Sequence, residues 1–525
     1  MIIASCLFLL GIITRIPFAS NLLYLGDSAR FALAMKEYDV AQMRPHAPGY
    51  ILYVALVKLV DFFINNEPAS LVVVSIASSA LTVFFLYFLA VRMYERSTAI
   101  ISASLLLTSP LFWFNAEIPL TYALEGLLSV TFAYTCYKII AAEKQWLLSS
   151  AIILGLATGI RQNIVIMFLP LWLYAIRKSS FKQIFFSFLL FGVTCLAWFT
   201  PMIALTGGLQ KYFAAVDAQF NTWVLHPAPF LFQIKGRWGV FSTFMVYSLG
   251  LGLLPMIYYF GRLFKIPTIM EDVRLKLLLL WLLPAVLFFI AVNVFNPGHV
   301  VVILPPIFLC LAESVKGLAG DLAQGIKTVF VESSSNLCKL LRGAFSYKAI
   351  LTSSVILLML INIYTFLFRN TQVSYAAIKD GDAKLAELVR LTKENFISEK
   401  TMILTCWFNT QAGFYLPHYL IYCPFPLIFS TSEVPIEAQN VYITFGHQTN
   451  PKTYWIPTGF RIQPLTVPTG IDTVILWEKE IAQYYNDSPQ PLKEIHSNLN
   501  DTKIYFLKVE PEQKIYYHYH YFTLR

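Results

Sequence analysis

Carboxylates and cations stand at the ends of several apolar runs, and together they could carry out acid–base chemistry on an anionic substrate. Asp27 follows the first apolar run, and Glu117 stands at the end of a later one. A carboxylate beside a reacting hydroxyl can act as its general base. Arginine and histidine cations stabilise phosphate oxygens. The candidates for that role are Arg44, His46, Arg161 and His299.

Each of these residues also has a purely structural interpretation. Asp27 before a helix would be an N-cap, which is compatible with catalysis because a helix N-terminus keeps a carboxylate ionised. Arg161 would extend to the membrane surface or meet a carboxylate such as Glu117. Glu125, about two turns into an apolar run, would be the partner of a buried cation. A lone histidine at an interface, such as His299, is more often structural.

The sequence RPHAPGY, residues 44–50, contains two prolines and a glycine and therefore predicts a rigid loop. The apolar run that follows carries Lys58 and Asp61, which is typical of an interfacial or re-entrant helix. Arg44 and His46 would then either bind an anionic group at the membrane surface or form an exposed loop.

The rest of the chain is that of a polytopic membrane protein. It is 57% hydrophobic and only 13% charged, whereas soluble domains carry roughly 25% charged residues. The net charge of +9 does not indicate nucleic-acid binding, because the basic residues lie in short connections between apolar runs. The first run lacks the basic start and the cleavage site of a signal peptide, so we expect a retained span.

Eleven apolar runs have spanning length. They lie at about 2–20, 69–91, 97–114, 119–140, 147–160, 163–177, 183–206, 239–261, 275–294, 299–315 and 349–368. Every even-numbered connection is basic. By the positive-inside rule these connections and the N-terminus are expected in the cytoplasm, and the membrane is expected to be the inner (cell) membrane. The odd-numbered connections then face outward, and the longest of them is 21–68.

The predicted domains are a transmembrane domain over 1–369 and an extracytoplasmic α/β domain over 370–525. The second is expected to begin with a helix at 382–396 and to hold a short helix at 411–419. Its predicted strands are 401–407, 420–425, 440–446, 473–480 and 502–510. A disulfide between Cys406 and Cys423 is one option for an extracytoplasmic domain.

The order of these elements resembles a known class. Asp27-Ser28 follows the first span, HAPGYILY occupies 46–53, SPLFW occupies 109–113, and Ala116-Glu117 ends that run. This pattern resembles the polytopic glycosyltransferases of the GT-C fold class, in the protein O-mannosyltransferase-like branch that includes the aminoarabinose transferase type. The architecture matches over about 1–370 and the motifs over about 1–125. Several relatives carry a second acidic residue soon after the loop aspartate, and here Ser28, Ala29 and Arg30 follow it.

The resemblance implies a fold of about eleven transmembrane helices and an inverting transfer of a sugar from a polyprenyl-phosphate donor to an acceptor hydroxyl on a protein, lipid or glycan. Asp27 would be the general base, with Glu117 as a second catalytic residue. The residues that would bind the donor and its phosphate are Arg44, His46, Tyr50, Arg161 and His299. No metal-ligand spacing appears in the sequence, and a need for a divalent cation is left open.

Two other functions fit many spans with charged residues between them. A lipid or polysaccharide flippase predicts internal repeats, which the sequence lacks, and leaves the long tail unexplained. The second alternative is a non-catalytic scaffold or a lipid-linked oligosaccharide polymerase. A polymerase would place its long outer loop between late spans, whereas here it follows the first.

Overall fold

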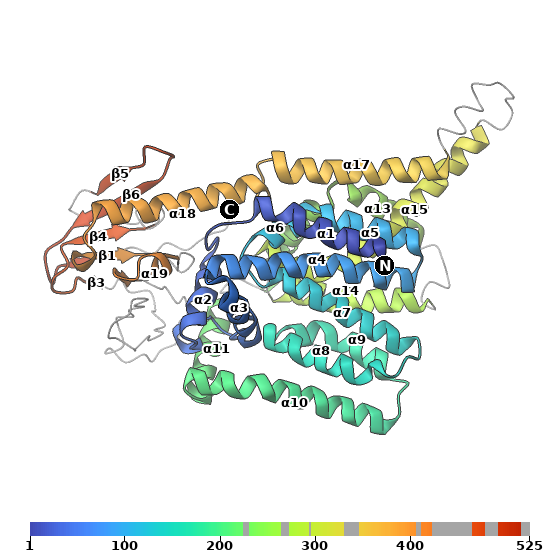
Figure 1. The fold of residues 1–525 in the computed structure, drawn as a ribbon, viewed down its shortest axis with the longest axis horizontal. Coiled ribbons are helices and arrows are strands. Elements are labelled where there is room, and N and C mark those ends of the chain that lie inside the picture. Colours follow the sequence, from blue (N-terminus) through green and yellow to red (C-terminus); the bar gives the residue numbers. More distant parts are fainter. Residues whose placement is uncertain are drawn as a thin grey trace.

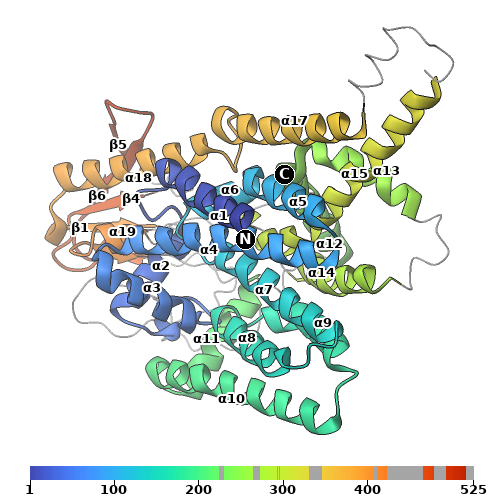
Figure 2. The same cartoon turned by 45° about the vertical axis from the view of Figure 1, so that its right-hand side comes forward.

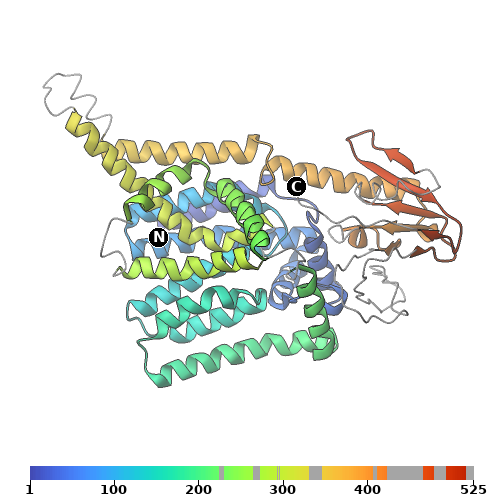
Figure 3. The same ribbon diagram turned by 180° about the vertical axis from the view of Figure 1, so that it is seen from behind.

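The computed structural model describes residues 1–223, 230–263, 272–292, 294, 296–329, 346–405, 411–422, 465–477 and 492–515. Long helices lie side by side, and a smaller module of strands and helices extends from one end of them (Figure 1). The short helices α2, α3 and α11 lie at that same end, as the view from behind also shows (Figure 3).

The long and medium helices follow the apolar runs. They are α1 (Ile2–Arg15), α4 (Glu67–Met93), α5 (Arg96–Thr108), α6 (Pro110–Glu117), α7 (Tyr122–Ile140), α8 (Trp146–Ile160), α9 (Ile164–Ile176), α10 (Phe181–Thr206), α12 (Phe230–Leu249), α13 (Leu253–Leu263), α14 (Val273–Ala291), α15 (Leu304–Val329) and α17 (Tyr347–Phe368). The connections hold α2 (Gly26–Lys36), α3 (Ile51–Ile64), α11 (Leu209–Trp223) and the 3₁₀ turns η1 (Ile16–Phe18), η2 (Val40–Gln42), η3 (Gly250–Gly252) and η5 (Pro297–Ile303).

Six of the described helices are long and apolar enough to cross a membrane, and the bent pair α5–α6, with an angle of 59° between its halves, would make seven. Three shorter apolar helices lie at Ile2–Phe18, Trp146–Ile160 and Ile164–Ile176. The chain is therefore a multi-pass helical membrane protein. Each of the eleven apolar runs coincides with a helix or a pair of helices, and eleven crossings remain a prediction.

The even-numbered connections meet at the end of the bundle away from the strands. Glu143 accepts hydrogen bonds from Nζ of Lys138 at 2.7 and 2.9 Å and lies 3.8 Å from Nη1 of Arg92, which joins the fourth connection to the second. Nζ of Lys316 lies 2.6 Å from Oε1 of Glu95, which joins the tenth connection to the second. Alternate connections therefore share one end, as the sequence pattern predicts.

Buried serine hydroxyls tie the apolar helices together, because a hydroxyl can donate and accept at once. Ser129 of α7 donates to the carbonyl of Val302 at 2.6 Å and accepts from Nε1 of Trp281 at 2.8 Å, which links α7, η5 and α14. Ser75 of α4 lies 2.9 and 3.1 Å from the carbonyls of Ile118 and Leu120. These bonds fix the turn between α6 and α7 near the site.

The tail module contains α18 (Tyr375–Asn395), η6 (Ser398–Lys400), α19 (Gln411–Tyr415) and a five-stranded sheet in the order β2-β1-β4-β6-β5. The strands are β1 (Thr401–Leu404), β2 (Leu420–Tyr422), β4 (Thr473–Leu476), β5 (Lys493–His496) and β6 (Lys503–Lys508), with β3 (Leu465–Thr466) and β7 (Lys514–Ile515) paired separately. β1 is parallel to β2 and β4, and the remaining pairs are antiparallel.

Most of the expected tail elements have a counterpart. Helices α18 and α19 overlap the expected helices, although α19 ends at Tyr415 and the expected helix at 419, and β1, β2, β4 and β6 lie within four of the five expected strands. Strand β5 has no counterpart in the sequence prediction because its residues are mostly exposed and polar. The expected strand 440–446 and both Cys406 and Cys423 lie outside the described residues.

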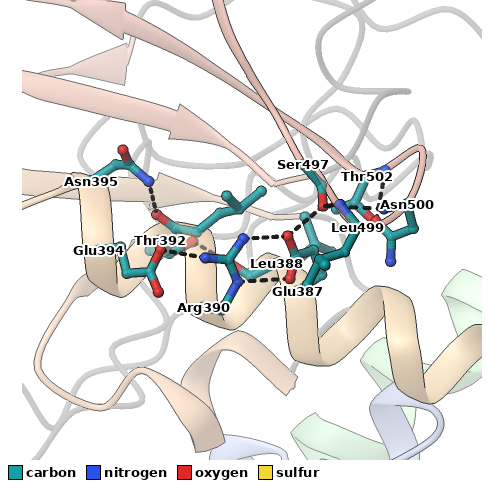
Figure 4. Close-up of polar contacts among 11 residues, drawn as sticks. Glu387, Leu388, Arg390, Thr392, Glu394, Asn395, Ser497, Leu499, Asn500 and Thr502 are labelled. Atoms are coloured by element: carbon teal, nitrogen blue, oxygen red, sulfur yellow. Dashed lines mark hydrogen bonds and ion pairs between the residues drawn. The ribbon is translucent and has the colours of Figure 1, made fainter.

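A buried carboxylate joins α18 to the turn between β5 and β6 (Figure 4). Glu387 accepts from Nε and Nη2 of Arg390 at 2.8 and 2.6 Å, and also from the hydroxyl of Ser497 in that turn. Arg390 is shared with Glu394, one helical turn further on. This cluster is internal to the tail module and holds its helix against its sheet.

Candidate active site

The candidate site begins on α2, which starts at the end of the bundle that carries the tail module (Figure 2). Its N-cap is Leu25, so Asp27 lies in the first turn and the expected N-cap role falls to another residue. Most side chains of α2 are buried, yet the Asp27 carboxylate is 37% exposed. The free N–H groups of a first helical turn favour an ionised carboxylate at this position.

An arginine and a histidine side chain flank the Asp27 carboxylate. Nη1 of Arg30 donates to Oδ1 at 3.1 Å, and Nδ1 of His46 lies 3.5 Å from the same oxygen. Burial would raise the pKa of the Asp27 carboxyl, but His46, Arg30 and Arg161 outweigh it and hold the pKa below its ordinary value. Asp27 is thus an ionised, accessible carboxylate between the buried side chains of Arg30 and His46.

His46 connects Asp27 to Tyr50. Its Nε2 lies 3.1 Å from the Tyr50 hydroxyl, and its ring packs against Phe31 of α2. Burial lowers the pKa of His46 to about 4, with Asp27 acting in the opposite direction, so the imidazole is neutral at pH 7. A neutral ring that accepts from Tyr50 at Nε2 presents an N–H to Asp27 at Nδ1.

The backbone of this loop is held in a conformation that its sequence requires. Gly49 has φ of +114°, and a Cβ there would lie 2.7 Å from Sδ of Met202 and 2.8 Å from the hydroxyl of Tyr38. Tyr50, the N-cap of α3, has φ of 45°. A bulky residue in the left-handed region is uncommon and persists where its surroundings enforce it. The Gln162 amide nitrogen donates to the carbonyl of Pro48 at 3.1 Å, which fastens the loop to the α8–α9 connection.

A buried ion pair lies in the neighbouring connections. Nη1 of Arg161, at the end of α8, donates to both carboxylate oxygens of Glu125 at 2.8 and 3.1 Å. The two side chains are 12% and 5% exposed. The guanidinium carbon lies 5.4 Å from the ring centroid of Tyr122. Among the described residues Nε and Nη2 of Arg161 make no further hydrogen bond, so the guanidinium can still donate to an anion.

His299 lies on the other side of Tyr122. The two ring centroids are 5.6 Å apart, and the His299 ring stacks on Phe289. Tyr122 fits closely because Gly298 has no side chain, and a Cβ there would lie 1.9 Å from the ring. His299 is buried, and its Nδ1 has no hydrogen-bond partner among the described residues. An unpartnered buried nitrogen next to Arg161 and Tyr122 suits a further polar ligand.

The structure therefore gathers five of the seven predicted site residues in one region. His46 contacts both Asp27 and Tyr50, and Arg161 lies within reach of them electrostatically, with His299 beyond Tyr122.

The other two predicted site residues lie elsewhere. Arg44 pairs with Glu37 at the exposed end of α2. Glu117 is fully buried and accepts from Nε1 of Trp113 at 2.7 Å, and the Arg15 guanidinium lies over the Trp113 ring. The carboxylate that Arg161 meets is Glu125 and not Glu117.

Two residues of this region, Arg30 and Tyr122, were not predicted as site residues from the sequence. Arg30 stands three residues after Asp27 on the same helix, a spacing that puts the two side chains on one face and could have predicted their contact. Tyr122 carries no such signal, because its role depends on packing between Arg161 and His299. Among the described residues no group of three His, Cys, Asp or Glu side chains could hold a metal ion.

Comparison with known proteins finds one matching family model and several solved structures of similar fold. Residues 27–184 match the family model of the protein O-mannosyl-transferase TMEM260 N-terminal domain. The fold is similar to that of ArnT from Cupriavidus metallidurans in the apo state, with a TM-score of 0.57 and 11% identity over 96% of this chain and 97% of that chain. For ArnT bound to undecaprenyl phosphate the TM-score is 0.55 and the identity 12%, over the same shares.

A third structure is less similar. The oligosaccharyltransferase AglB from Archaeoglobus fulgidus, in complex with an inhibitory peptide and a dolichol-phosphate, gives a TM-score of 0.43 and 11% identity over 98% of this chain and 75% of that chain. No curated protein sequence matches the chain significantly. The resemblance to GT-C transferases drawn from the sequence motifs is confirmed, and so is the prediction of a glycosyltransferase.

Proposed function

We propose that this protein transfers a sugar from a polyprenyl-phosphate donor to an acceptor hydroxyl at the outer face of the membrane, with inversion at the anomeric carbon. The single observation that carries the proposal is the accessible Asp27 carboxylate beside a buried cationic site on the same end of the bundle. Undecaprenyl phosphate in one ArnT structure supports a lipid-phosphate donor of this kind.

The reaction assigns one task to each part of the site. The acceptor oxygen attacks the anomeric carbon while its proton passes to Asp27, and the bond from that carbon to the phosphate oxygen breaks with its electron pair. The free donors of Arg161 and the unpartnered Nδ1 of His299 stabilise the departing phosphate. His46 and Tyr50 orient Asp27 and line the donor side of the site.

The two remaining predicted residues, Arg44 and Glu117, support the structure around the site and do not contact the substrate. Arg44 shapes the loop through its pair with Glu37. Glu117 fixes the end of α6 against α1 through Trp113 and the charge of Arg15. The lipid chain of the donor would follow α3, whose Phe62 and Phe63 rings are strongly exposed.

We also propose eleven crossings of the inner membrane, with the N-terminus in the cytoplasm and the tail module outside. The clustering of basic even-numbered connections at one end and the candidate site at the other supports this orientation. It places the site in the leaflet where a lipid-linked donor presents its sugar to extracytoplasmic acceptors.

The test is transfer from radiolabelled polyprenyl-phosphate sugars by membranes that contain the protein. We expect Asp27→Asn to lower kcat by about 10²- to 10⁴-fold, the usual contribution of a general base. Asp272→Asn, which removes a carboxylate at the opposite end of the bundle, is the matched control and should transfer normally. Equal transfer by Asp27→Asn would eliminate Asp27 as the base. Absence of transfer from every donor by the unmodified protein would favour a lipid or polysaccharide flippase.

A further inference from the structure

The segment that leads into α2 is held by the tail module, more than 350 residues away in the chain. Oδ1 of Asp382 accepts from the Ser20 hydroxyl at 2.7 Å, and Oδ2 accepts from the backbone N–H of Asn21 at 2.7 Å. The Tyr415 hydroxyl accepts from the backbone N–H of Leu23 at 2.9 Å. Two backbone donors just before α2 therefore depend on side chains of α18 and α19.

Tyr24 adds contacts on both faces of the same segment. Its ring lies against Gly381, where a Cβ would come within 2.7 Å, and its hydroxyl donates to the carbonyl of Ala377 at 3.4 Å. Its own carbonyl accepts from the Gln411 amide at 3.4 Å. The Tyr24 ring thus fills the space that the missing side chain of Gly381 leaves on α18, so the two surfaces are complementary in shape.

Helix α2 itself is shared between two hydrophobic cores. Ala29, Phe31 and Ala32 belong to the core of the helical bundle, whereas Leu33 belongs to the core of the tail module with Leu385. At the far end of α2, Nζ of Lys36 lies 4.7 Å from the ring centroid of Phe414, and α19 packs beside α2 (Figure 2). The tail module therefore contacts the helix at its start, on one face and at its end.

These contacts act on the helix that carries the proposed base. Catalysis by a positioned carboxylate requires it to sit within hydrogen-bond reach of the acceptor proton, and a misplacement of about 1 Å can cost about 10²-fold in rate. The bundle contacts α2 itself through apolar side chains, and it holds the segment before α2 by a hydrogen bond from the Ser20 N–H to the Glu117 carbonyl at 2.9 Å. Directed hydrogen bonds fix a position more narrowly than apolar contacts do. Asp382 and Tyr415 supply directed bonds to the backbone six and four residues before Asp27.

We infer that Asp382 and Tyr415 are positioning residues of the transfer reaction, which makes α18 and α19 part of the framework of the active site. The inference rests on the proposed function. It differs from a role of the tail in acceptor binding alone, because a positioning role acts on kcat with the donor KM unchanged.

The test compares Asp382→Asn and Tyr415→Phe with Glu387→Gln. Glu387 is the matched control because it is a buried acid on the same helix whose described partners, Arg390 and Ser497, both lie within the tail module. We expect Asp382→Asn and Tyr415→Phe to lower kcat about 10- to 100-fold, with the donor KM within about 2-fold of its starting value. Amide hydrogen exchange over residues 20–36 should become faster in both. Glu387→Gln should change neither quantity.

Three outcomes would overturn the inference. One is unchanged exchange over 20–36 in both variants, and another is faster exchange with an undiminished kcat. The third is a rise in acceptor KM alone, which would assign the tail to acceptor binding. If Asp382→Asn fails to accumulate in membranes, Tyr415→Phe carries the test, because it removes one hydroxyl and no bulk. Failure of the proposed function is distinguishable, because the unmodified protein would then transfer from no donor.

Discussion

Neutralising the buried Arg161–Glu125 pair one side at a time separates its structural contribution from a catalytic one. Arg161→Gln leaves the Glu125 carboxylate, 5% exposed, without its cation. Breaking a buried ion pair from one side costs about 3–5 kcal/mol, mostly because the remaining charge is buried and unpaired. Glu125→Gln is milder, at about 1–3 kcal/mol, since Arg161 keeps Tyr122 and one amide oxygen as partners.

The double variant Arg161→Gln with Glu125→Gln distinguishes the two roles. It leaves no unpaired charge, and replacing both members of a buried pair is often nearly neutral for stability. We therefore expect its unfolding free energy in detergent to return most of the way to that of the unmodified protein. Transfer should not return, because the loss of one electrostatic stabiliser of the leaving group costs about 10²- to 10³-fold in rate.

The assay is donor-dependent transfer normalised to folded protein, measured beside the denaturation midpoint for all four proteins. A double variant that recovers both stability and transfer would refute the reasoning and make Arg161 purely structural. Glu125→Gln, which keeps the guanidinium, should transfer better than either variant that lacks it. Arg177→Gln, which removes an exposed arginine at the opposite end of α9, is the matched control and should behave normally.

Three further predictions concern the surroundings of Asp27. Arg30→Gln removes a cation that lowers the pKa of Asp27, so the pKa of Asp27 should rise. Because a base acts when deprotonated, the acidic limb of the pH profile of kcat/KM should move to higher pH, and an unmoved limb would indicate that another residue is the base. Gly49→Ala should destabilise the protein by about 1–3 kcal/mol in thermal unfolding, because φ of +114° and the close Met202 and Tyr38 atoms leave no room for a methyl group. Glu117→Gln should lower the unfolding temperature and leave kcat per folded molecule nearly unchanged, since Glu117 faces Arg15 and Trp113; a selective fall in kcat would restore it as a catalytic residue.

The end of the helical bundle at which each residue lies was predictable, because hydropathy and basic connections follow directly from the cost of burying charge in lipid. That reasoning put Asp27, His46, Arg161 and His299 at one end of the bundle although they lie up to 272 positions apart. The rigid loop and the helix after Pro48 were likewise predictable, because proline and glycine restrict the backbone locally. Helix α3 begins at Ile51, directly after that loop.

The pairing of charges within that end was not predictable, because it depends on how helices rotate against one another. Arg44 and His46 are two residues apart and looked equivalent as phosphate ligands, yet one pairs with Glu37 at the surface and the other is buried against Phe31. The contacts between the tail module and residues 20–24 depend on a separation of more than 350 residues, for which one sequence holds no signal.

The turn between α6 and α7 shows how small a feature decides such a pairing. Glu117 ends α6 and Glu125 lies in the first turn of α7, and only Ile118–Thr121 separate the two helices. Ser75 of α4 holds the carbonyls of Ile118 and Leu120, so the chain reverses there and the two carboxylates point to different partners, Arg15 through Trp113 and Arg161 directly. Removing the Ser75 hydroxyl frees two buried carbonyls, and relaxation of this turn would move Glu125, and with it Arg161, without altering any residue of the site itself.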